Sequence, residues 1–231
     1  PSPDSAETPS PASPKHLSKR ELYTLSAATA VVTANAYYIH PIIAVVADDF
    51  GVSHAMIGMV PAFNQIALAL GILLLLPLGD WVSNRRLTSI FVAAQFLSIA
   101  VMALAQEYWL FVIGSTVLGF FTIAPYLLPT YVSKRVAPGD LGKATAIITT
   151  GIIAGILLAR AGAGVMGEYL GWRSVYIVAA ALMLAVTFAL PMIMEKRDSR
   201  TVAAPGQSYV GLIASIVPIM RQHPEIMLSG S

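Results

Sequence analysis

Charged residues are scarce in this sequence, and cysteine is missing altogether. Of the 231 residues, 11% are charged and 56% are hydrophobic, whereas soluble domains carry about 25% charged residues. The lack of cysteine excludes disulfides and thiol chemistry without selecting a compartment. We also find no Ser/His/Asp set, no paired carboxylates and no metal-ligand spacing. The sequence is therefore unlike a soluble domain, and its motifs indicate no enzyme, no metal site and no cofactor.

Long apolar segments organise the chain. A helix needs about 20 mainly apolar residues to cross the roughly 30 Å hydrocarbon core, because lipid cannot satisfy exposed backbone groups. Segments of this kind, separated by short polar stretches, cover residues 22–47, 55–78, 87–106, 109–132, 143–168 and 172–194. We therefore predict an all-α membrane protein whose six transmembrane helices lie within residues 21–195.

The two ends of the chain have a different composition. Residues 1–20 begin with the Pro- and Ser-rich run PSPDSAETPSPASP, which has too little apolar surface to fold, so we expect a disordered cytoplasmic tail and no signal peptide. Residues 196–231 contain apolar residues near helical spacing. We expect a cytoplasmic linker there, with an amphipathic helix on the membrane surface.

Basic residues predict the orientation of the spans. Arg173 alone falls on one side, and eleven fall on the other: Lys15, Lys19, Arg20, Arg85, Arg86, Lys134, Arg135, Lys143, Lys196, Arg197 and Arg200. The positive-inside rule then places both termini in the cytoplasm, as in a bacterial inner membrane protein. The bases are spread over every inner loop and form no single patch with aromatic residues, so we expect no nucleic-acid partner.

A GxGxxG pattern occurs at Gly162, Gly164 and Gly167, but it lies inside a membrane-length helix. A dinucleotide-binding loop needs a preceding strand and an acidic residue about 20 positions later, and neither is present. We interpret the glycines differently. Gly151 and Gly155 begin a ridge of small residues at intervals of four, which predicts a helix-packing face on the fifth span.

Polar residues at membrane depth are the candidate site. Arg160 is costly to insert, so it either faces a cavity or snorkels to the interface; ionisable residues inside spans more often serve function. Further polar groups converge from the first, second and fourth spans, and with Arg160 we take the following set as a cavity lining for a small-molecule substrate: Asn35, Tyr38, Asn64, Tyr126 and Arg160. Each alone can equally serve interhelical hydrogen bonding, the role expected for Gln95.

Two roles are open for His40. It is the titratable group at this depth with a charge change near neutral pH, and the predicted spans contain no Asp or Glu apart from Glu168 at the outer end of the fifth. It could therefore carry protons. A structural role beside Pro41 is the more common case, because proline in a span frees a carbonyl that a neighbour must satisfy.

Three stretches resemble the amino-terminal half of a major facilitator superfamily transporter of the bacterial drug or sugar efflux type: YYIHPIIAVVADDFGVS, LPLGDWVSNRRL and GILLARAGAGVMGEYLGWRSVY. The second is similar to the family's loop motif GxLaDrxGrkr, with Asp80, Arg85 and Arg86 in place and other positions changed. The resemblance implies a conformational gate there. Gly151 and Gly155 match the start of the antiporter motif GxxxGPxxGG, whereas Ile156 and Arg160 depart from it.

The resemblance implies a function and leaves one alternative open. In the family, two six-span halves form one transporter, so we expect a half-transporter that exports a small amphipathic molecule by proton-coupled alternating access. It would act as a homodimer or with a second six-span half, in contact with membrane lipid. The alternative is a non-transporting scaffold that binds a partner through the small-residue face of the fifth span.

Overall fold

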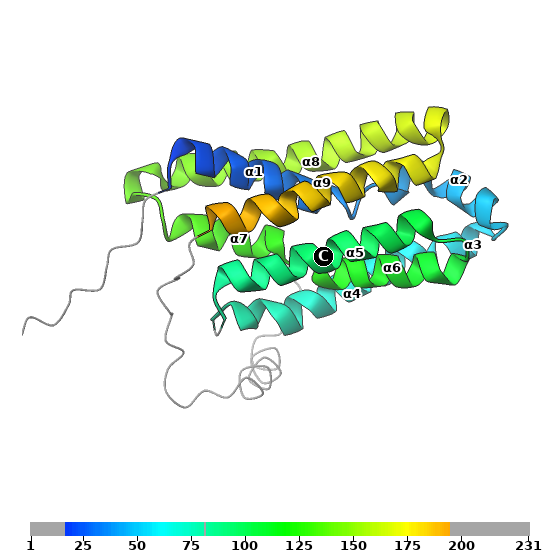
Figure 1. Cartoon of the computed structure of the whole chain (residues 1–231), viewed down its shortest axis with the longest axis horizontal. Coiled ribbons are helices and arrows are strands. Elements are labelled where there is room, and N and C mark those ends of the chain that lie inside the picture. The colour runs from blue at the N-terminus through cyan, green and yellow to red at the C-terminus, as the bar shows by residue number, and fades with distance from the viewer. Residues whose placement is uncertain (1–16, 81, 195–231) are drawn as a thin grey trace, which may run out of the picture.

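The computed structural model describes residues 17–80 and 82–194, and the predicted spans are helical in it (Figure 1). Residues 1–16 of the predicted tail and the predicted linker at 196–231 lie outside the described residues. Six helical segments are long and apolar enough to cross a membrane. The prediction of an all-α fold with six spans is confirmed, and the chain is an integral membrane protein.

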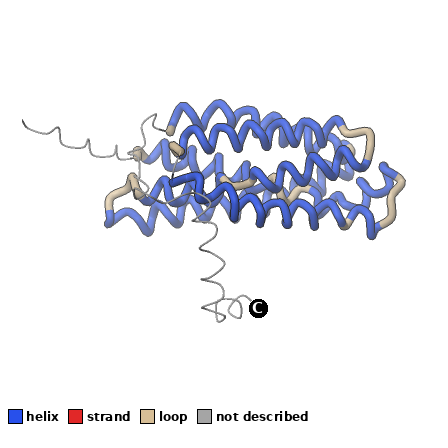
Figure 2. Tube along the Cα trace, turned by 90° about the horizontal axis from the view of Figure 1, so that it is seen from below, coloured by secondary structure: helices blue, strands red, loops and turns tan. Residues whose placement is uncertain are grey.

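Three of the spans are single long helices, and three are built from shorter pieces (Figure 2). The first consists of α1 (Lys19–Ala34) and α2 (Ile39–Phe50), and the second of α3 (His54–Ile57), α4 (Met59–Leu75) and the 3₁₀ helix η1 (Leu76–Asp80). The third is α5 (Asn84–Leu104), and the fourth joins α6 (Tyr108–Phe121) to α7 (Ala124–Ser133). After η2 (Pro138–Asp140), α8 (Leu141–Leu170) and α9 (Trp172–Ile193) form the fifth and sixth.

The start of α1 shows how local chemistry sets a helix boundary. The Ser18 hydroxyl accepts a hydrogen bond from the Glu21 N–H at 3.3 Å, and the Glu21 carboxylate accepts one from the Ser18 N–H at 2.8 Å. This capping box satisfies two backbone donors that a helix start leaves unpaired. The helix therefore begins at Lys19, before the apolar segment starts at residue 22.

The six spans run nearly parallel to one long axis and pack in pairs distant in sequence. α1 lies against α8, α4 against α6, and α5 against α9 (Figure 1). The segments around residues 80–84 and 134–138 lie at one end of the bundle together with the start of α1, and the turns around 51–53, 105–107 and 171 lie at the other. The basic residues predicted for the inner side thus share one end, where they are described.

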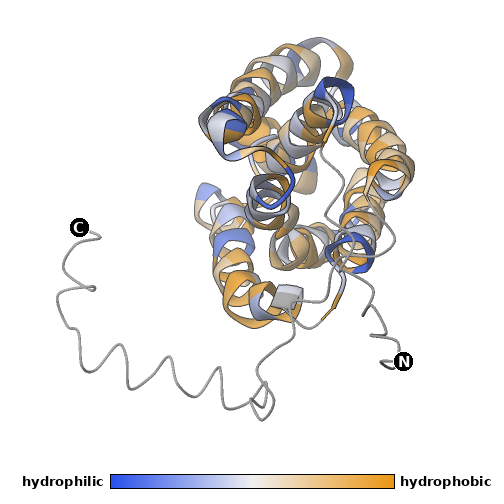
Figure 3. Ribbon diagram, turned by 90° about the vertical axis from the view of Figure 1, so that its left-hand side faces the viewer, coloured by the Kyte–Doolittle hydropathy of each residue, from blue (hydrophilic) through white to orange (hydrophobic). Residues whose placement is uncertain are grey.

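Hydrophobic residues predominate along the helices (Figure 3), and many of them are exposed on the outside of the bundle. Leu104, Leu158 and Met192 are 77%, 72% and 85% exposed, whereas Phe111 and Tyr176 are buried in the core. A surface of this kind suits a hydrocarbon environment and would be costly in water.

Candidate functional site

The first span is interrupted near its middle. α1 ends at Ala34, residues 35–38 form a turn, and α2 begins at Ile39. Pro41 has no N–H, so the Tyr37 carbonyl four residues earlier loses its helical donor. His40 Nδ1 lies 3.3 Å from that oxygen. His40 is thus placed for the structural role suggested beside Pro41, although its ring is exposed.

The fourth span is interrupted in the same way, which the apolar pattern did not predict. α6 ends at Phe121 and α7 begins at Ala124, with Pro125 as its second residue. Pro125 cannot donate to the Phe121 carbonyl. Two other donors reach this oxygen: the Ile123 N–H at 2.8 Å and Gln95 Nε2 of α5 at 2.9 Å.

Gln95 also reaches the interruption in the first span. Its Oε1 accepts a hydrogen bond from Asn35 Nδ2 at 3.2 Å, and both side chains are buried. Because the Phe121 carbonyl can only accept hydrogen bonds, the Gln95 amide must turn its nitrogen toward it, and Asn35 must then present its own nitrogen to Gln95 Oε1. Asn35 Oδ1 has no hydrogen-bond partner among the described residues. A buried polar chain therefore joins the two interruptions.

Asn64 is engaged in helix packing. Its Nδ2 donates to the Ser115 carbonyl at 2.7 Å and contacts the Ser115 hydroxyl at 3.4 Å, which ties α4 to α6. A Cβ added at Gly119 would overlap the Asn64 carbonyl, so the two backbones nearly touch. Tyr38 is also buried. The structure thus places Asn35, Tyr38 and Asn64 inside the bundle.

Tyr126 and Arg160, the other two members of the predicted cavity lining, are exposed. The guanidinium carbon of Arg160 lies 5.4 Å from the centre of the Tyr37 ring. Tyr37 stacks on His40 with a centroid separation of 5.8 Å. The structure therefore brings Arg160, Tyr37 and His40 together on one surface of α8 and the interrupted first span.

The small-residue ridge of α8 packs within the chain. A Cβ added at Gly155 would overlap the Ala30 carbonyl, and one added at Gly151 would lie 2.6 Å from the Ser26 carbonyl oxygen. These contacts place the backbones of α1 and α8 at a distance that any larger residue would prevent. α1 of the same chain thus occupies the face on which the scaffold alternative depends.

The predicted gating residues lie at the end of the bundle where α5 begins. Asp80 ends η1, and Arg85 and Arg86 belong to the first turn of α5. The two arginines border an open cavity of about 470 Å³, which is also lined by Ser83, Ser89, Ile90 and Pro191. The cavity is therefore basic and connects the start of α5 with the end of α9.

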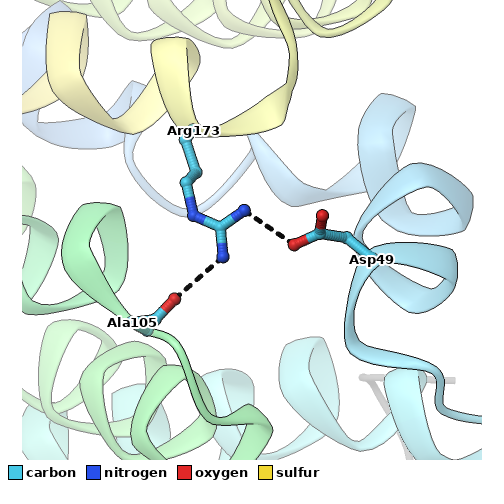
Figure 4. Close-up of polar contacts among 3 residues, drawn as sticks. All are labelled: Asp49, Ala105 and Arg173. Atoms are coloured by element: carbon cyan, nitrogen blue, oxygen red, sulfur yellow. Dashed lines mark hydrogen bonds and ion pairs between the residues drawn. The ribbon is translucent and has the colours of Figure 1, made fainter.

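Arg173 organises the opposite end (Figure 4). Its Nη1 donates to Asp49 at 2.7 Å, and its Nη2 donates to the Ala105 carbonyl at 3.1 Å. The guanidinium carbon also lies 4.2 Å from the centre of the Trp172 ring. One side chain thus links the ends of the first, third and sixth spans. Arg173 is the single basic residue predicted for the outer side, and this isolation was the signal that could have identified it.

Comparison with known proteins agrees with this architecture. A sequence profile described as the Major Facilitator Superfamily matches residues 25–228. The chain is 32% identical over 189 residues to the "Uncharacterized transporter YgaY" of Escherichia coli O157:H7, a match that covers 81% of this chain and 48% of that protein. It is 28% identical over 202 residues to the "Probable transporter SCO4007" of Streptomyces coelicolor, covering 86% of this chain and 45% of the relative.

A third relative carries a more specific name. The "Purine ribonucleoside efflux pump NepI" of Escherichia coli O127:H6 is 28% identical over 150 residues, which cover 62% of this chain and 36% of the pump. The chain spans about half the length, or less, of the curated relatives it matches.

Proposed function

Because this chain belongs to the Major Facilitator Superfamily, we propose that it forms one six-span half of a secondary membrane transporter. The half would act with a second copy or with a separate second half, both termini lying in the cytoplasm. It would export a small amphipathic molecule by alternating access, in exchange for protons. The profile match and the relatives named as transporters support this proposal.

The pair of interrupted helices carries the proposal. The interruptions lie near the middle of the first and fourth spans, which cover Lys19–Phe50 and Tyr108–Ser133. Transporters commonly place substrate sites near the bilayer midplane, where discontinuous helices expose backbone polar groups. The bonds from Gln95 to both interruptions hold them at one level of the membrane. The two bends can therefore act as hinges that move together.

The polar residues divide into two groups in this proposal. Tyr126 and Arg160 contact the substrate, because their side chains are exposed. Asn35 and Asn64 are positioning residues that act through the helices they join, and Tyr38 is buried beside them in the core. Asp80, Arg85 and Arg86 belong to the gate at the cytoplasmic end, and His40 is the candidate proton carrier.

Flux in proteoliposomes is the direct test. The full chain would be reconstituted, a proton gradient imposed, and the movement of labelled adenosine, inosine and guanosine followed, since one relative is named for purine ribonucleosides. We expect gradient-dependent flux that Pro125→Ala slows severalfold. The new N–H at position 125 would bond the Phe121 carbonyl, compete with Gln95 and close the interruption.

Pro129→Ala is the matched control. Pro129 lies inside α7 of the same span, and the helix continues through it without a break, so its replacement leaves both hinges unchanged and flux near the wild-type rate. Equal flux in the wild type and in Pro125→Ala would contradict a transport role for the interruption. Flux that ignores the gradient would contradict proton coupling.

A further inference from the structure

Arg160 lies level with the interruption of the first span. On α8, Gly155 faces Ala30 of α1, and a Cβ added at Gly164 would lie 3.6 Å from Pro41 of α2. Arg160 falls between these two contacts, as the turn at residues 35–38 falls between α1 and α2. Arg160 is therefore level with the middle of the first span, ten residues before the end of α8, and its side chain is exposed on the surface of the bundle.

No group in the described part of the chain neutralises this cation. Arg160 has no hydrogen bond or ion pair there, and its described contact is the Tyr37 ring. Glu168 is the nearest acid along α8, and two helical turns separate it from Arg160, or about 12 Å at 1.5 Å per residue. The other acids described are at the ends of the spans: Glu21, Asp48, Asp49, Asp80, Glu107 and Asp140.

A guanidinium in this position requires a partner. Arginine stays protonated in proteins, so it cannot become neutral as a buried lysine does. Its fork of N–H groups matches a carboxylate or phosphate with two parallel bonds. The Tyr37 ring limits where the guanidinium can lie, through a cation–π contact, and the His40 ring stacked on Tyr37 limits the tyrosine in turn.

We propose that the surface formed by Arg160, Tyr37 and His40 binds the anionic group of an organic anion, a carboxylate or a phosphate carried by the transported molecule. The inference deepens the proposed transport function and rests on it. Arg160 supplies the charge and the two donors, and Tyr37 and His40 hold it in place. The substrate class is thereby narrowed from small amphipathic molecules to amphipathic anions.

Binding of benzoate and benzamide tests the site, because the two have the same shape and differ in charge. The purified full chain in nanodiscs of zwitterionic phosphatidylcholine would be titrated with radiolabelled benzoate by scintillation proximity. We expect benzamide not to compete, and Arg160→Gln to weaken benzoate binding about tenfold or more, as expected when a hydrogen-bonded charge is lost. Arg160→Lys should retain part of the affinity, because it keeps the charge and loses the fork.

Lys143→Gln is the matched control, since it removes an exposed cation from the same helix at its inner end and should leave binding unchanged. Equal binding to wild type and Arg160→Gln, equal competition by benzamide, or no benzoate binding at all would overturn the proposal. Loss of benzoate binding in nanodiscs with phosphatidylglycerol, restored by removing that lipid, would assign the site to lipid headgroups and would overturn it too.

The two proposals can fail separately. Nucleoside flux without benzoate binding would overturn the anion site and leave the transport function standing. Arg160-dependent benzoate binding without flux of either labelled benzoate or labelled nucleosides would support the anion site and contradict transport. A carboxylate from a second half that pairs with Arg160 would appear as benzoate binding to single copies that is lost on assembly, and this result would overturn the substrate role.

Discussion

Gln95 and Gln65 are glutamines of neighbouring spans in opposite surroundings. Gln95 is fully buried with both ends of its amide bonded, whereas Gln65 is exposed on α4. Gln95→Leu removes one of the two donors to the Phe121 carbonyl, which keeps the Ile123 N–H, and leaves the Asn35 amide without a partner. We therefore expect the free energy of unfolding to fall by about 1–2 kcal/mol. Reversible unfolding in mixed detergent micelles measures this change.

Gln65→Leu is the control, and it should change the free energy of unfolding by no more than about 0.5 kcal/mol. Equal losses in both variants would contradict the bridging role of Gln95.

The contact between α1 and α8 is set by glycines on one face of one helix. A Cβ at Gly155 would overlap the Ala30 carbonyl, whereas nothing lies within 4 Å of a Cβ at Gly162 on the same helix. Gly155→Ala should therefore destabilise the chain by about 1–3 kcal/mol, as overpacking does. Gly162→Ala should be neutral or stabilising by up to about 1 kcal/mol, because alanine favours the helix. Thermal unfolding of the two variants side by side measures the difference, and a Gly155→Ala variant as stable as Gly162→Ala would show that α1 is not held at this distance.

Every span of the bundle exposes apolar side chains, and Arg160 of α8 has no ion-pair or hydrogen-bond partner among the described residues. Two copies in the same orientation, related by an axis along the membrane normal, would reproduce the arrangement of parallel repeats found in transporters. We therefore expect two copies of the chain per particle when native mass spectrometry is performed on protein released from lipid nanodiscs. A single copy at every protein concentration would contradict the homodimer and favour a separate second half.

Much of this architecture was predictable because the membrane imposes strong rules on sequence. Six apolar segments predicted six spans, since each backbone group must be satisfied within its own helix. The face of α8 that contains Gly151 and Gly155 was identified as a packing face, and the structure places α1 against it. The capping box at Ser18 starts the first helix at Lys19, only three residues before the predicted apolar segment begins at residue 22.

The candidate site was predictable only in part. Pro41 and Pro125 each remove one backbone donor, which is a local signal. This signal supported the structural role suggested for His40 beside Pro41, whereas the apolar pattern continues through Pro125 and gave no sign of the second interruption. Asn35, Asn64 and Gln95 are equivalent in sequence terms, as amides at membrane depth. Their different roles depend on which helix each amide faces. Asn35 bonds Gln95, 60 positions away, and Asn64 bonds Ser115, 51 positions away, so the sequence around each amide does not identify its partner.

The sequence by itself determined the class of the molecule: an all-helical membrane protein of six spans with one basic end, because hydrocarbon thickness and backbone hydrogen bonding leave little choice. The tertiary structure alone decided which polar side chains are buried in contacts between helices and which are exposed on the surface of the bundle. Asn35, Tyr38 and Asn64 are buried, whereas Tyr126 and Arg160 are exposed. The reason is geometric, since a side chain's partners are set by the rotation of each helix and the approach of its neighbours, and neither is written in the order of residues along one span.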